Sequence, residues 1–203
     1  VPNLYLVSPE NALRLTEYVR AGGHLLMSFF SGIVDEYDRV HLGGYPAPFR
    51  ELLGLRVDEF RPLDAGQVVD VELLGEAGGA TLWSERITTE GAEVLGRFAD
   101  GSPALTRSDF GSGVAWYLGT RPDPSLLQAL TEHVVARAGV EPVVAGLPRG
   151  VQAVRRGDFL FLLNHNAHPS TVDLDRPMTD LLARESAPTK HVVLQERGVA
   201  VLR

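Results

Sequence analysis

The chain has 203 residues, of which 44% are hydrophobic and 22% are charged, as in ordinary globular proteins. Its formal net charge of −7 argues against nucleic acid or an anionic membrane as the main partner, because both demand a basic surface. The chain has no cysteine, which excludes disulfides, thiolate metal sites and cysteine nucleophiles. No signal peptide precedes the first element, and the longest apolar runs are too short to span a bilayer. We therefore expect a cytoplasmic protein.

The first third of the chain shows the order of elements typical of a parallel α/β sheet. Residues 4–7 are expected to end a strand, and Ser8 then caps a helix that stops at Gly22. Residues 24–30 form a continuous apolar run, the pattern of a strand buried on both faces. A short helix is predicted over residues 48–53. Strand, helix and buried strand in this order predict parallel pairing.

The middle of the chain consists of short strands separated by Gly, Pro and Asp turns, which we expect to add antiparallel strands to the sheet. The predicted strands are residues 57–60, 68–74, 81–87, 94–98 and 114–118. A well-marked helix follows, with Asp123 as its cap, Pro124 at its first position and Gly139 at its end.

The last quarter of the chain is predicted to form a second domain. Residues 141–150 are rich in Pro and Gly and indicate a linker. The remaining sequence has no convincing helix, and its expected antiparallel strands are residues 151–155, 159–163, 171–174, 191–195 and 199–202. The expected organisation is a domain of residues 1–140, a linker of residues 141–150 and a small β domain of residues 151–203.

Motifs for catalysis or ligand binding are missing. No nucleophile elbow, dinucleotide fingerprint or phosphate-binding loop occurs. Gly111-Ser112-Gly113 is predicted to be a hairpin turn, and Arg156-Gly157-Asp158 a tight turn between two strands. His165 and His168 lack the further ligands that a zinc site needs, and are interpreted as polar turn residues. We predict no catalytic, cofactor-binding or metal-binding residue, and no cofactor.

The segment Ser31–Pro48 is a long loop at the C-terminal end of a buried strand. In open α/β sheets this edge is where ligands and partners dock, and long ordered loops tend to be functional. A partner-binding loop and a solvated acidic loop are both open interpretations, and a metal or catalytic site is the least favoured. Because interfaces favour aromatic anchors with Arg, we expect Asp35, Tyr45 and Phe49 to lie in or beside a subunit contact.

Motifs along the chain also carry a resemblance to a known family. In the first domain they are Gly22-Gly23-His24, Phe30-Ser31-Gly32-Ile33-Val34-Asp35-Glu36, Leu42-Gly43-Gly44-Tyr45-Pro46, Phe49-Arg50, Leu53-Gly54-Leu55, Val57-Asp58-Glu59-Phe60, Phe110-Gly111-Ser112-Gly113 and Trp116-Tyr117-Leu118-Gly119-Thr120. Together they resemble the trimerisation domain of glycoside hydrolase family 42 β-galactosidases. Arg155-Arg156-Gly157-Asp158, Phe161-Leu162-Leu163-Asn164-His165 and Gly198-Val199-Ala200-Val201-Leu202 look like the small C-terminal β domain of that family.

The resemblance implies a flavodoxin-like α/β fold, similar to class I glutamine amidotransferases, with a mostly parallel sheet, antiparallel additions and a small antiparallel β domain. The first strand or strands of that sheet would lie upstream of Val1. Family enzymes place two catalytic glutamates in an N-terminal (β/α)8 barrel, and their acid/base glutamate follows an asparagine. Here no asparagine is followed by glutamate, so no catalytic residue is carried over.

The function implied is that of a non-catalytic oligomerisation and C-terminal region of a β-galactosidase acting on terminal non-reducing β-D-galactosides. Such a region would form a homotrimer and support the barrels that bind the galactoside. The alternative is a stand-alone sugar-binding module with an amidotransferase-like fold. The upstream coding sequence distinguishes these two interpretations. A barrel that contains an Asn-Glu pair would support the assembly region of a β-galactosidase.

Overall fold

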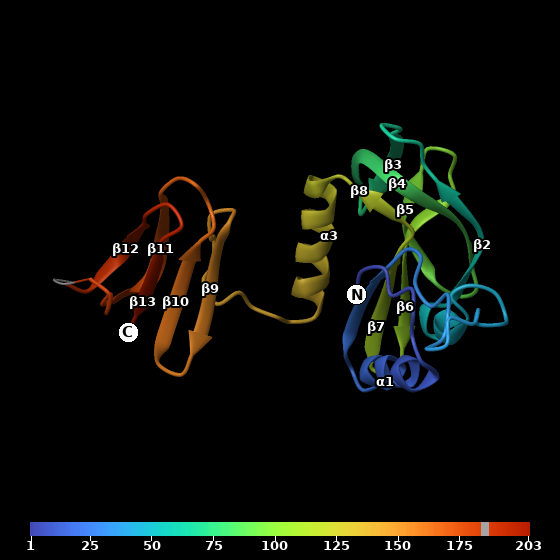
Figure 1. The fold of residues 1–203 in the computed structure, drawn as a ribbon, viewed down its shortest axis with the longest axis horizontal. Coiled ribbons are helices and arrows are strands. Elements are labelled where there is room, and N and C mark those ends of the chain that lie inside the picture. Colours follow the sequence, from blue (N-terminus) through green and yellow to red (C-terminus); the bar gives the residue numbers. More distant parts are fainter. Residues whose placement is uncertain (184–186) are drawn as a thin grey trace. The chain divides into compact units, whose positions relative to one another are not determined.

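The chain divides between Val140 and Glu141 into two units, each with its own core, in a computed structural model that describes residues 1–183 and 187–203 (Figure 1). Each unit is described by itself. No helix in the described ranges is long and apolar enough to cross a membrane.

The helices of the first unit begin where the capping residues predict. Helix α1 spans Pro9–Arg20, and the Ser8 hydroxyl accepts a hydrogen bond from the backbone N–H of Asn11 at 3.2 Å. Helix α3 spans Pro124–Arg137, and the Asp123 carboxylate accepts bonds from Ser125 and Leu126. The hydrogen bonds from Ser125 and Leu126 help to lower the pKa of Asp123 to about 2. Between these two helices, a 3-10 turn, η1 (Ala47–Phe49), leads into α2 (Arg50–Leu53).

Eight strands form one mixed sheet in the first unit. They are β1 (His24–Ser28), β2 (Leu55–Pro62), β3 (Val69–Leu73), β4 (Glu76–Thr89), β5 (Glu93–Phe98), β6 (Pro103–Phe110), β7 (Gly113–Leu118) and β8 (Thr120–Pro122). Their order is β1-β7-β6-β5-β3-β4-β2, and β8 pairs with β4 (Figure 1). The predicted hairpin turn at Gly111-Ser112 joins β6 to β7 and is confirmed.

The sheet differs from the mostly parallel one that was expected. Among the strands of the described residues only β1 and β7 pair in parallel, and the other pairs are antiparallel. The physical reason is the length of the connections, because successive strands joined by short turns can only return antiparallel. Strands β6 and β8 were not predicted, since β6 (PALTRSDF) has mostly polar residues in its second half.

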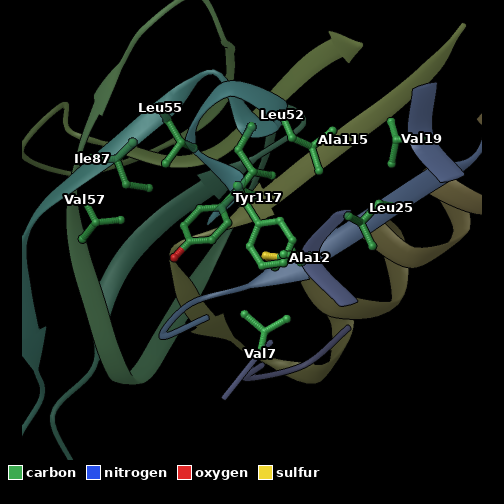
Figure 2. Packing of buried hydrophobic residues seen from close by; sticks show 13 residues of the cluster. Val7, Ala12, Val19, Leu25, Leu52, Leu55, Val57, Ile87, Ala115 and Tyr117 are labelled. Atoms are coloured by element: carbon green, nitrogen blue, oxygen red, sulfur yellow. The ribbon is translucent and has the colours of Figure 1, made fainter. Parts of the chain in front are cut away.

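The core of the first unit occupies both faces of the sheet. Ala115 and Tyr117 of β7 point into one cluster with α1 and α2, whereas Trp116 and Leu118 point into another with α3. Successive residues of a strand face opposite sides, which explains why this run is apolar throughout. Figure 2 shows the Tyr117 ring within the first cluster.

The second unit contains two antiparallel sheets. The first has the order β13 (Val199–Leu202), β10 (Phe159–Asn164) and β9 (Val151–Arg156), and the second pairs β11 (Ser170–Met178) with β12 (Thr189–Leu194). The predicted turn at Arg156-Gly157-Asp158 joins β9 to β10, with Gly157 at a φ of 56°. Residues 141–150 contain no helix or strand, and Val144 is buried in the core of this unit.

Candidate interaction site

The loop Ser31–Pro48 follows β1 and is tied to the beginning of the chain. The Ser31 hydroxyl accepts the backbone N–H of Leu4 at 2.9 Å and donates to the carbonyl of Ser28 at 2.7 Å. Val34 forms a parallel bridge with Leu6 and is only 2% exposed. The first half of the loop is therefore a packed structure, and a purely solvated loop does not describe it.

Asp35 organises the turn of residues 35–39 within this loop. Its carboxylate accepts hydrogen bonds from the backbone N–H groups of Tyr37 and Arg39, at 2.8 and 3.0 Å, and from the Arg39 guanidinium at 2.8 Å. Partial desolvation raises the pKa of Asp35, but the hydrogen bonds from Arg39 and Tyr37 together outweigh it and lower the pKa below its ordinary value. The Arg39 guanidinium in turn lies 4.7 Å from the centre of the Tyr37 ring.

Tyr45 and Phe49 lie at different depths. Tyr45 is half-buried, its backbone bridges to Val57, and its ring centre lies 4.8 Å from that of Phe60. Phe49 is fully buried in the core of the unit beneath the loop, beside Leu52 and Leu53. Phe49 can thus support a contact made by the loop, but its own side chain has no surface to offer.

Three apolar side chains of the loop are strongly exposed, and we call them the loop tip. They are Tyr37 at 70%, Val40 at 52% and Leu42 at 91% exposed. The contact expected from the sequence named Asp35, Tyr45 and Phe49, and none of the three loop-tip residues. The signal that could have found them is the presence of branched apolar residues within a charged loop.

Beside the loop lies a group of four aromatic side chains, which we call the aromatic cluster. Its members are Tyr5, Phe30, Phe60 and Trp83. Phe30 is central, with ring centres 5.5 Å from Tyr5, 5.3 Å from Phe60 and 4.9 Å from Trp83. Tyr5 is 40% exposed, and the other three side chains are half-buried.

The buried side chain of Glu85 forms hydrogen bonds with two members of the aromatic cluster. Glu85 is 1% exposed, and its Oε1 accepts hydrogen bonds from the Phe30 backbone N–H at 2.9 Å and the Trp83 Nε1–H at 3.1 Å. Its Oε2 accepts the Tyr117 hydroxyl at 2.7 Å. Burial raises the pKa of Glu85 because it disfavours the charged carboxylate, and the three hydrogen bonds that Glu85 accepts lower the pKa by less than burial raises it. Both oxygens are occupied, so this carboxylate serves to orient its neighbours.

Exposed apolar side chains beside a cluster of aromatic rings are features of a surface that contacts another protein. The chain matches the family model of the beta-galactosidase trimerisation domain over residues 1–141 and that of the beta-galactosidase C-terminal domain over residues 150–203. The chain therefore belongs to the glycoside hydrolase family 42 β-galactosidases, as their trimerisation and C-terminal region.

Individual relatives agree with this assignment. The chain is 41% identical to a beta-galactosidase of an Arthrobacter species, covering 91% of this chain and 27% of the relative. It is 39% identical to beta-galactosidase LacZ of Heyndrickxia coagulans, covering 100% of this chain and 31% of the relative.

Solved structures are similar over the same extent. The beta-galactosidase of Bacillus circulans sp. alkalophilus is 35% identical, with a TM-score of 0.89 over 99% of this chain and 32% of that chain. The enzyme of the haloarchaeon Halorubrum lacusprofundi is 28% identical, with a TM-score of 0.85 over 100% of this chain and 30% of that chain. The chain thus spans less than a third of the length of these relatives, and a stand-alone sugar-binding module is not favoured.

Proposed function

We propose that this chain is the assembly region of a larger β-galactosidase that hydrolyses terminal non-reducing β-D-galactosides, and that it joins three copies and supports their catalytic barrels. The observation that carries the proposal is the match of residues 1–141 to a trimerisation domain. The galactoside would bind in the barrel, outside this chain. The cysteine-free composition fits a reducing cytoplasm, where we place the enzyme.

We further propose that the sheet is completed by preceding strands into a flavodoxin-like, amidotransferase-like fold. The support is that Val1 pairs in parallel with β1, on the side of β1 that faces away from β7. The Val1 nitrogen donates to the carbonyl of Leu26 at 2.7 Å, and the Ser28 N–H donates to the carbonyl of Val1 at 3.1 Å. These two bonds flank Met27, as in a parallel ladder. Further parallel strands beside β1 would increase the parallel share of the sheet.

The subunit contact is proposed to include Asp35 and Tyr45 of the loop Ser31–Pro48, with Phe49 supporting it from the core. Asp35 holds the turn that exposes the loop tip, and Tyr45 joins the loop to Phe60. A monomer gains little by exposing such side chains, whereas a cyclic assembly can bury them against a neighbour.

The test compares this chain with the intact polypeptide of the full reading frame. Sedimentation equilibrium should give the mass of three copies for the intact polypeptide, which should hydrolyse a chromogenic β-galactoside. This chain alone should show no turnover. Hydrolysis that retains the configuration of the sugar requires two carboxylates about 5–5.5 Å apart on either side of the glycosidic bond. No catalytic glutamate of the family is carried over to this chain. A monomeric intact polypeptide, or turnover by this chain that persists through repeated purification, would contradict the proposal.

A further inference from the structure

The aromatic cluster is held at the surface by two features that cost free energy. Phe30 has a φ of 56°, in the left-handed region that bulky residues rarely adopt. Glu85 is a carboxylate buried without a charged partner in the described ranges. A single oxygen of Glu85 binds both the Phe30 backbone and the Trp83 indole. The effect is to fix two large rings where each remains only half-buried.

The loop tip is held by a second set of polar contacts, one of which comes from Tyr5 of the aromatic cluster. Asp35 accepts three hydrogen bonds within the turn, and the Tyr5 hydroxyl donates to Asp38 Oδ1 at 3.2 Å. Asp38 itself has a φ of 60°. These contacts stabilise a turn in which Tyr37 is 70% exposed, and Leu42, which follows the turn, is 91% exposed. The unit therefore presents two apolar surfaces whose backbone is held by hydrogen bonds, the loop tip and the aromatic cluster.

Two different surfaces on one unit are what a closed ring of three requires. A contact around a threefold axis is heterologous, so each copy offers one surface to one neighbour and a different surface to the other. Large aromatic side chains are the usual anchors of such contacts, and the loop tip contributes one of its own, Tyr37. The aromatic cluster is also continuous with the proposed subunit contact, because Phe60 packs against Tyr45.

We infer that the aromatic cluster of one copy receives the loop tip of a second copy of this chain. The inference rests on the proposed assembly function and adds to it the two surfaces that meet. Glu85 belongs to the receiving surface only through Phe30 and Trp83, whose orientation it sets.

The experiment uses the intact polypeptide with one change on each surface. Leu42→Ser alters the loop tip, and because this side chain is 91% exposed its removal leaves the fold of the unit intact. Trp83→Ala alters the aromatic cluster, with Trp83→Phe as a milder variant in case the first misfolds. Leu127→Ser is the matched control, since Leu127 is 42% exposed on α3, whose buried residues pack in the other core cluster. Sedimentation across a dilution series should show trimer dissociation at roughly tenfold higher concentration, or more, for each surface variant and no change for the control.

Combining the two changes in one chain tests whether the surfaces meet each other. If the loop tip contacts the aromatic cluster, Trp83→Ala already removes much of the contact that Leu42→Ser would remove. The double variant should therefore dissociate at a concentration close to that of the weaker single variant, well below the concentration expected if the two effects simply added.

The outcomes separate this inference from the function on which it rests. A monomeric wild-type polypeptide would overturn both. A wild-type trimer that is unaffected by Leu42→Ser and by both Trp83 variants would overturn only the inference. Single-variant effects that add fully in the double variant would show that each surface meets something other than the partner surface named here, which overturns the pairing.

Discussion

The Tyr117 hydroxyl donates a hydrogen bond of 2.7 Å to Glu85 Oε2, and each of the two side chains is 1% exposed. Burial raises the pKa of Tyr117 well above its ordinary value, and the neighbouring Glu85 charge adds to this effect. Tyr117 comes from β7 and Glu85 from β4, which are the second strands from opposite ends of the strand order. The pair links the first core cluster to the underside of the aromatic cluster.

Replacing Glu85 by Ala should destabilise the first unit by about 3–5 kcal/mol, because it leaves three buried donors without an acceptor. Urea unfolding followed by tryptophan fluorescence measures this unit alone, since both tryptophans, Trp83 and Trp116, belong to it. The control is Glu59→Ala, because the side chain of Glu59 is 48% exposed and its ion pairs lie at the surface. Equal unfolding midpoints for the two variants would refute a structural role for Glu85.

Stability should also depend on pH through Glu85. Since burial raises the pKa of Glu85, the folded chain holds this proton more tightly than the unfolded chain does. The stabilising contribution is then complete below the ordinary pKa of 4.5 and is lost as the pH rises through the higher folded value. The free energy of unfolding of the wild type, minus that of Glu85→Gln, should therefore fall as the pH rises above about 4.5. Urea titrations from pH 4 to 8 measure the difference, and a flat or rising difference would contradict the expected direction.

Asp35→Ala should loosen the turn that carries the loop tip, because the backbone N–H groups of Tyr37 and Arg39 lose their acceptor. Hydrogen exchange of these two amides should quicken roughly fivefold to tenfold, the factor for one ordinary hydrogen bond. Glu36→Ala is the neighbouring control, since Glu36 is an exposed carboxylate in the same turn. Unchanged exchange at Tyr37 would mean that the turn is held by other contacts.

Tyr45→Ala should weaken assembly of the intact polypeptide by roughly 1–3 kcal/mol, the range of a moderate to strong interface anchor. The variant removes the ring that packs against Phe60 and so disturbs the edge of the aromatic cluster. Sedimentation across a dilution series is the measurement. A trimer that persists unchanged to the lowest measurable concentration would rule out a role for Tyr45 in the contact.

Local signals in the sequence were sufficient for the elements that depend on nearby residues. Ser8 and Asp123 marked the two long helices through their capping bonds. The apolar runs at residues 24–30 and 114–118 predicted strands buried on both faces; β7 confirms this, whereas β1 is a strand in which buried and half-buried residues alternate. The resemblance to the trimerisation domain was likewise present in short motifs and agrees with the family match.

Only the tertiary structure decided how these elements combine. Strand β6 has few apolar residues in its second half and became a strand because β5 and β7 supply hydrogen bonds on both of its edges. Phe49 follows helical spacing with Leu52 and Leu53, and the fold turned that face into the core, away from any neighbour. The bond from Phe30 to Glu85 joins residues 55 positions apart. Capping and periodicity act over a few residues, whereas buried pairs of this kind depend on which strands the closed sheet brings together.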